Sequence, residues 1–379
     1  MSAGTRHGQQ AYVPAFDGYR ALCIIGVVCF HVGPTSAGWL ESLRLRGWFG
    51  VDAFFVLSGF LITSILLGEL DRRGTIALPR FYLRRALRLQ PAYLSTVLAI
   101  VLVTRLFSAK DYQTVAPALP YILTYTLNLA VGIGGLLPPA FLLITWSLCV
   151  EEQFYLGWPW LLRTLGAAPM LRALPWIIGL LAAWRSATYL SLASGQFWEP
   201  AASIVNRLMM STDMRIDGIF VGCLIALAMR ANRPGWLWTR LRTSRPLPSL
   251  AVLLAVATIW WLHAPDMLPI YILIGPTATA AVYGLLLAVI FLQPDSWPAR
   301  LLAQKPLIFI GRVSYGVYLF HYFLADKVIH LVGVRRGDAY SMPQELLAIT
   351  IVLSASVLLA WLHYVLIEAR VMAWREKIS

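Results

Sequence analysis

The stretch RALCIIGVVCFH, residues 20–31, places an arginine and a histidine at the two ends of an uninterrupted apolar run. On a helix this spacing is about three turns, so both side chains lie on nearly one face, roughly 16 Å apart along the axis. Ionisable side chains at membrane depth are costly, and they face a protein interior or a water-filled path rather than lipid. The stretch therefore predicts a membrane helix that carries chemistry.

The composition of the whole chain fits this interpretation. Of the 379 residues, 59% are hydrophobic and only 13% are charged, which excludes an ordinary soluble globular domain. The 15 tryptophans and 16 tyrosines suit a protein with two interfacial aromatic belts. The four cysteines show no CxxC spacing, so we expect neither a disulfide nor a metal site.

Ten apolar segments are long enough to be candidate membrane spans, and no linker divides them. They lie near residues 18–34, 48–68, 91–108, 142–162, 173–194, 214–230, 248–263, 269–292, 307–332 and 346–367. The sequence therefore predicts an all-α integral membrane protein in which residues 1–379 form a single domain.

A further apolar run, 119–133, is shorter and ends in a Gly- and Pro-rich segment. With ten crossings and the N-terminus inside, the inner segments hold 20 Lys and Arg and the outer segments hold 6. The positive-inside rule requires this asymmetry, and an eleventh crossing would place the basic stretch 230–245 outside. We therefore expect both termini in the cytoplasm and a re-entrant or interfacial segment near 119–141. The net charge of +13 then reflects topology and anionic lipid rather than nucleic acid.

Six short motifs follow one another along the chain. They are FDGYRA at 16–21, GVDAFFVLSGFLI at 50–62, FYLRRALRLQP at 81–91, WSLCVEEQFY at 146–155, RID at 215–217 and VSYGVYLFH at 313–321. Each motif is weak alone, but their order resembles the acyltransferase family 3 of integral membrane proteins from residue 16 to about residue 368. Members include O-acyltransferases of glycans, Nod factors and macrolides.

The resemblance implies a ten-helix fold and transfer of an acyl group, most often acetyl, from cytoplasmic acyl-CoA. Acyl-CoA would be a co-substrate, with no permanently bound cofactor. The acceptor would be a hydroxyl of a glycan, a lipid-linked saccharide or a glycosylated metabolite. The chain departs from the family pattern at Phe323 and at Glu368-Ala369-Arg370, where the family often has proline. A C-terminal hydrolase-like domain, present in some members, is not expected here.

His31 is the expected general base, because an imidazole can accept a proton from a hydroxyl as that hydroxyl attacks a thioester. The alternative is a buried histidine that is hydrogen-bonded to a neighbouring helix. The family pattern places an acid at Glu151, which could orient the imidazole as in a His–acid dyad.

The expected ligands of the acyl-CoA donor are Arg20, Arg84, Arg85 and Arg88. Arg84 and Arg88 are four residues apart, so a helix presents both guanidinium groups on one face. Guanidinium groups bind phosphates in pairs of hydrogen bonds, and coenzyme A carries several phosphates. The alternatives are an interfacial anchor for Arg20 and a lipid-facing basic loop for the other three.

The remaining candidate residues are expected to contact the acceptor. They are Arg215, Asp217 and Tyr315. Arg215 and Asp217 could instead pair with each other, and Tyr315 and His321 could serve only in packing or hydrogen bonding.

The leading expectation is thus an acyltransferase in the bacterial cytoplasmic membrane. A polytopic transporter of an anionic or sugar-containing solute is the rival class, because intramembrane Arg, Glu and Asp suit transport equally well. A second enzyme rival is the other large superfamily of membrane acyltransferases, whose catalytic histidine lies late in the chain, at a position such as His321 or His363.

Overall fold

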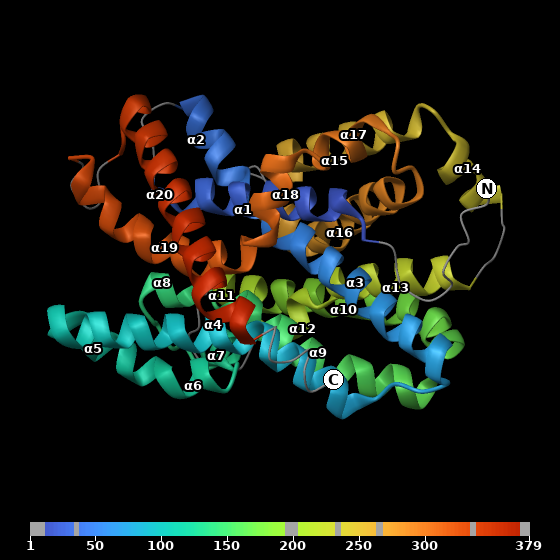
Figure 1. The fold of residues 1–379 in the computed structure, drawn as a ribbon, viewed down its shortest axis with the longest axis horizontal. Coiled ribbons are helices and arrows are strands. Elements are labelled where there is room, and N and C mark those ends of the chain that lie inside the picture. The colour runs from blue at the N-terminus through green and yellow to red at the C-terminus, as the bar shows by residue number, and fades with distance from the viewer. Residues whose placement is uncertain are drawn as a thin grey trace.

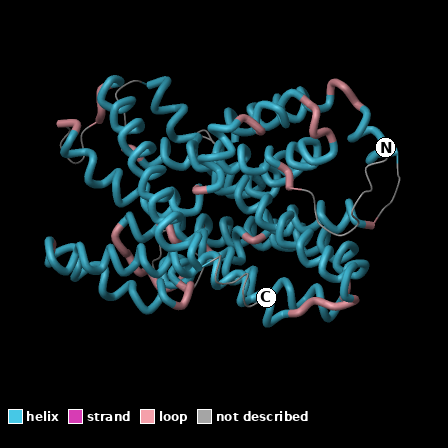
Figure 2. The backbone as a smooth tube through the Cα atoms, in the orientation of Figure 1, coloured by secondary structure: helices cyan, strands magenta, loops and turns pink. Residues whose placement is uncertain are grey.

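The structure is a computed structural model that describes residues 12–33, 38–193, 204–231, 236–262, 268–333 and 339–371. These residues form helices joined by turns, and no β-strand occurs among them (Figure 1 and Figure 2). The prediction of an all-α chain is confirmed.

The long helices carry most of the described residues. They are α1 (Pro14–His31), α3 (Phe49–Arg73), α4 (Leu78–Phe107), α9 (Trp146–Leu165), α10 (Ala167–Ala193), α13 (Asp217–Arg230), α15 (Leu247–Leu262), α16 (Leu268–Leu292), α19 (Ser314–Leu331) and α20 (Met342–His363). The short helices are α2 (Gly38–Leu45), α5 (Ala109–Val115), α6 (Leu119–Leu123), α7 (Leu127–Gly132), α8 (Ala140–Leu143), α11 (Ile204–Met210), α12 (Thr212–Arg215), α14 (Trp236–Thr243), α17 (Trp297–Leu302) and α18 (Lys305–Arg312). Two 3₁₀ turns (Arg46–Trp48 and Ala116–Ala118) and a π-helical turn (Tyr364–Glu368) complete them.

Five helical stretches are long and apolar enough to cross a membrane. They are Gly38–Arg73, Leu78–Phe107, Ala167–Leu192, Pro269–Leu292 and Met342–Val371. A sixth is added if α18 and α19, which meet at an angle of 73°, are one broken span. Other expected spans, such as α13 with 14 residues and α15 with 16, are shorter than the ~20 residues of a full crossing. The described residues thus contain five or six candidate spans, and the count of ten stays a prediction.

The apolar run 119–133 is broken into two short helices. α6 has 5 residues and α7 has 6, and between them Tyr125 adopts a left-handed backbone conformation with φ of 54°. The Tyr125 ring stacks on that of Tyr93 at 4.6 Å between centroids, and its hydroxyl donates to Gln90. This segment is therefore not a straight crossing, as the charge distribution predicted.

α1 contacts several other helices along its length. It packs against α3, α17, α18 and α19, and these neighbours surround it in Figure 1. α3 packs closely on α13, because Gly59 faces the Ile219 carbonyl and Gly222 faces the Val56 carbonyl without an intervening side chain. Small residues at a helix interface let two backbones approach closely inside a membrane. The two glycines thus fix the position of α13 against α3.

Candidate active site

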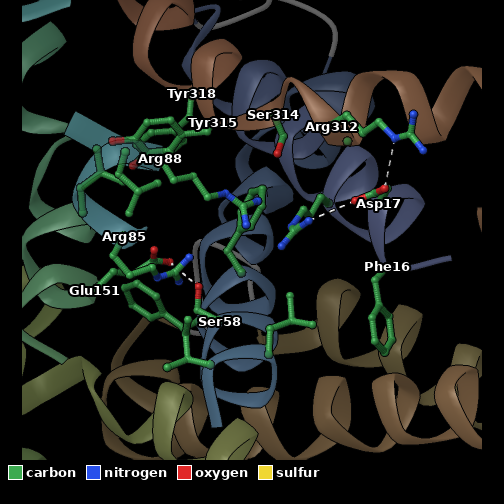
Figure 3. Close-up of a pocket in the computed structure, with 18 of the residues that line it drawn as sticks. Phe16, Asp17, Ser58, Arg85, Arg88, Glu151, Arg312, Ser314, Tyr315 and Tyr318 are labelled. Carbon is green, nitrogen blue, oxygen red and sulfur yellow. Dashed lines mark hydrogen bonds and ion pairs between the residues drawn. The ribbon is translucent and has the colours of Figure 1, made fainter. Parts of the chain in front are cut away.

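A cavity of about 500 Å³, here called the arginine cavity, opens between α1, α3, α4, α9, α18 and α19 (Figure 3). Hydrophobic side chains of α1 and α3, among them Phe16 and Phe54, form part of its wall. Its polar lining consists of Tyr12, Asp17, Arg20, Ser58, Arg85, Arg88, Ser147, Glu151, Tyr155, Arg312, Ser314, Tyr315, Tyr318 and Glu368. Three of the four arginines expected to bind the donor lie here, and so does Tyr315.

The arginines of this cavity differ in whether a carboxylate balances the charge of the guanidinium group. Arg20 forms an ion pair with Asp17 at 3.0 Å. The Arg85 guanidinium lies 4.3 Å from the centroid of the Tyr155 ring, and its Nε is buried with no hydrogen-bond partner in the described part of the chain. Arg88 reaches into the same space from α4, and no ion pair joins it to a described carboxylate (Figure 3). Guanidinium groups that lack a carboxylate partner bind anions through charge-assisted hydrogen bonds, so this cavity suits an anion.

Glu151 belongs to the arginine cavity and not to the surroundings of His31. Its Oε1 accepts a hydrogen bond from Ser58 at 3.0 Å, and its Oε2 accepts one from Tyr155 at 2.9 Å. In the structure the carboxylate therefore orients groups beside Arg85, and the His31–Glu151 dyad expected from the sequence is not formed.

Arg84 lies apart from the other two arginines of its motif. Its guanidinium forms an ion pair with Glu69 at 3.2 Å, and Glu69 also accepts a hydrogen bond from the backbone N–H of Ala77. Arg84 does not line the arginine cavity. The contact ties the end of α3 to the start of α4.

A second cavity of about 360 Å³, here called the histidine cavity, has His31 in its lining. The other polar or aromatic side chains there are Asp111, Thr114, Phe141, Tyr322, Asp326 and Tyr340. Arg20 and His31 therefore line different cavities, although both lie on α1.

His31 is paired with a second histidine. Its Nδ1 lies 2.9 Å from the Val27 carbonyl oxygen and 3.0 Å from Nε2 of His321. His321 is fully buried, and its own Nδ1 lies 2.7 Å from the Tyr318 carbonyl oxygen. The Tyr318 side chain lines the arginine cavity, so Tyr318, His321 and His31 connect the two cavities.

Arg215 and Asp217 are fully buried and line neither cavity. Arg215 pairs with Asp52 and lies 3.0 Å from the Tyr271 hydroxyl. Asp217 pairs instead with Arg185 at 2.9 Å. The predicted contact of Arg215 and Asp217 with an acceptor is therefore not supported by the structure, and they do not pair with each other. Within a membrane, buried charges are stabilised by such partners.

His363 has a local role at the end of α20. Its Nε2 lies 2.7 Å from the Ser95 hydroxyl and its Nδ1 lies 3.1 Å from Glu368. Glu368 is thereby held where it lines the arginine cavity, although the sequence departs there from the family pattern.

Comparison with known proteins identifies the family of the chain. The family model described as an acyltransferase domain matches residues 13–365, nearly the whole chain. The chain belongs to the acyltransferase family 3. The predicted family and enzyme class are thus confirmed. No solved structure matches the chain.

Two bacterial relatives are similar over most of this acyltransferase domain. The chain is 30% identical over 350 residues to "Peptidoglycan O-acetyltransferase OatA" of Listeria monocytogenes, which covers 85% of this chain and 50% of the relative. It is 31% identical over 336 residues to "Putative peptidoglycan O-acetyltransferase YrhL" of Bacillus subtilis, which covers 82% and 48%. The chain thus spans about half the length of the curated relatives it matches.

Proposed function

We propose that this chain is a membrane O-acyltransferase that moves an acetyl group from acetyl-CoA to a hydroxyl of a glycan. The observation that carries the proposal is the convergence of Arg20, Arg85 and Arg88 on one cavity in a member of an acyltransferase family. A glycan acceptor is supported by the names of the relatives, which are peptidoglycan O-acetyltransferases.

The arginine cavity would bind the nucleotide end of acetyl-CoA. Coenzyme A carries phosphates, and guanidinium groups that lack carboxylate partners bind phosphate through charge-assisted hydrogen bonds. Arg85 and Arg88 supply these groups from α4, and Arg20 joins them from α1. The apolar wall would accommodate the less polar part of the donor.

His31 would act as the general base on the acceptor hydroxyl. The hydroxyl oxygen forms a bond to the acyl carbon, the carbon–sulfur bond of the thioester breaks, and the hydroxyl proton passes to the imidazole. The imidazolium returns a proton to the departing thiolate, which leaves as the CoA thiol. Each acetyl-CoA therefore yields one ester and one free thiol.

We further propose that the chain crosses a bacterial cytoplasmic membrane ten times, with both termini in the cytoplasm. The excess of Lys and Arg in the inner segments supports this orientation. Arg85 and Arg88 then lie near the cytoplasmic face, where acetyl-CoA is made available, and His31 lies toward the outer face.

Turnover of radiolabelled acetyl-CoA by the purified chain in lipid nanodiscs tests the proposal. We expect label to move to glycans extracted from the source cells, together with release of free CoA thiol. Deleting the gene should leave the corresponding surface glycan one acetyl group lighter by mass spectrometry. A transporter would move a solute without consuming acetyl-CoA, and that result would overturn the proposal.

Replacing Arg88 by alanine should raise the KM for acetyl-CoA about tenfold or more, the effect of losing one charge-assisted hydrogen bond. The turnover number at saturation should fall less, because the lost contact is made equally in the ground state and the transition state. Initial rates at varied acetyl-CoA concentrations measure both quantities.

Arg84→Ala is the matched control, because Arg84 shares the motif but pairs with Glu69 outside the cavity. Its KM should equal that of the wild type. If Arg88→Ala has an unchanged KM, these arginines do not bind the donor. They would then serve as a lipid-facing positive anchor.

A further inference from the structure

The pairing of His31 with His321 limits where the protons of both rings can lie. A backbone carbonyl oxygen only accepts hydrogen bonds, so a nitrogen within bonding distance of one must carry a proton. His321 Nδ1 lies 2.7 Å from the Tyr318 carbonyl and His31 Nδ1 lies 2.9 Å from the Val27 carbonyl, so both Nδ1 atoms are protonated.

The remaining nitrogens follow from this assignment. In a neutral imidazole with a protonated Nδ1, Nε2 carries the lone pair. His321 Nε2 is therefore an acceptor, and the Nδ1–H of His31 is shared between the Val27 carbonyl and His321. Among the described residues, no hydrogen bond reaches Nε2 of His31, and His31 lines the histidine cavity.

We infer that His321 is a positioning residue that fixes the tautomer and the orientation of His31, so that Nε2 is the proton acceptor and the histidine cavity holds the acceptor saccharide. This inference rests on the proposed function and names the atom that performs its proton transfer. The role parallels that of a group that orients the base in a nucleophile–base–orienter arrangement.

The histidine cavity has the lining that a saccharide hydroxyl requires. Asp111 and Asp326 supply carboxylates, Thr114 supplies a hydroxyl, and Tyr322 and Tyr340 supply aromatic faces with a polar end. The Tyr322 ring lies 4.5 Å from the His31 ring between centroids, so a sugar resting on Tyr322 would lie beside the imidazole.

His321 lies where it can orient the base without contacting either substrate. Its side chain is 0% exposed and lines neither cavity. A change at His321 should therefore reach the reaction only through His31. The turnover number should respond, whereas the KM for acetyl-CoA should not.

Two amide substitutions separate the two hydrogen bonds of His321. In His321→Asn the amide N–H₂ takes the place of Nδ1, so the bond to the Tyr318 carbonyl is kept and the acceptor for His31 is lost. In His321→Gln the amide oxygen takes the place of Nε2, so the acceptor for His31 is kept. Loss of the partner that orients a metal-bound histidine typically costs about 10- to 100-fold in metal affinity or activity, and we expect a loss of the same order for a catalytic histidine.

We expect His321→Asn to lower kcat by about 10- to 100-fold with an unchanged KM for acetyl-CoA, and His321→Gln to recover most of that loss. The assay is CoA-thiol release by the full chain in nanodiscs, with oligosaccharides of N-acetylglucosamine as the acceptor probe and extracted cell-wall glycan beside it. Val317→Ala is the control, because the Val317 side chain is fully buried one turn earlier on α19 and only packs, and alanine keeps the backbone carbonyl that faces His321.

The possible outcomes distinguish this inference from the proposed function. If the wild-type chain transfers no acetyl group to either acceptor, the proposed function fails. If the wild type is active and His321→Asn keeps its kcat, the positioning role alone is overturned. The positioning role is also overturned if His321→Gln is as slow as His321→Asn while both variants retain wild-type melting temperature and acetyl-CoA binding.

Discussion

Glutamine in place of His31 should reduce the turnover number by about 10²- to 10⁴-fold, the range typical of a lost general base. Glutamine keeps a hydrogen-bonding side chain of similar length but has no titratable nitrogen. Acetyl-CoA binding should be retained, because the arginine cavity does not include His31. Single-turnover rates and equilibrium binding of acetyl-CoA, measured on the same purified variant, separate the two effects.

Cys29→Ala serves as the control for this substitution. Cys29 lies on α1 two residues before His31 and lines neither cavity. Its replacement should leave both turnover and binding unchanged. Substantial turnover by His31→Gln would make His31 a structural histidine, and the proton acceptor would then be sought at Glu151 or His321.

Alanine in place of Gly222 should lower the free energy of unfolding by about 1–3 kcal/mol, the usual cost of overpacking. A Cβ atom at Gly222 would meet the Val56 carbonyl and the Phe60 backbone nitrogen, and backbone atoms cannot move aside independently. α3 and α13 would have to separate. Thermal unfolding of the detergent-solubilised chain, followed by circular dichroism, measures the change.

Gly179→Ala is the matched comparison within a long helix. A Cβ atom at Gly179 on α10 meets no atom within 4 Å. Alanine has a higher helix propensity than glycine, so this variant should be as stable as the wild type or slightly more stable. Equal melting temperatures for the two variants would show that α3 and α13 tolerate a wider separation than the structure indicates.

Features of the fold that depend on local patterns could be predicted from the sequence. Apolar runs of sufficient length indicated the long helices, because a lipid-facing backbone must satisfy its hydrogen bonds within the helix. The Gly- and Pro-rich end of the run 119–133, together with the charge distribution, correctly predicted that it is not a straight span. The bend between Arg312 and Ser314, where α18 meets α19, has no comparable signal and was not predicted.

The site was predictable only in part, because many of its residues interact with residues that are distant in the sequence. The four-residue spacing predicted that Arg84 and Arg88 act together, but the cavity is lined by Arg85 and Arg88, and Arg84 pairs with Glu69 outside it. Arg215 and Asp217 are neighbours in sequence, yet their partners Asp52 and Arg185 lie on other helices. No local pattern encodes such pairs.

The partner of His31 was missed for the same reason. An acidic partner was expected at Glu151 by analogy with His–acid dyads, whereas the structure supplies His321, 290 residues away in the sequence. The only signal was the motif VSYGVYLFH itself, which ends in that histidine.

α1 carries Arg20 in one cavity and His31 in the other, and an α-helix hardly stretches. The distance between the end that would hold the donor and the group that would take the proton is therefore set by eleven residues of helix, roughly 16 Å. In the proposed reaction, α1 would therefore set the distance that the donor has to span. A thioester on a long, flexible arm can satisfy both ends at once, whereas a short thioester can reach only one. The helix would select its donor by length as well as by charge.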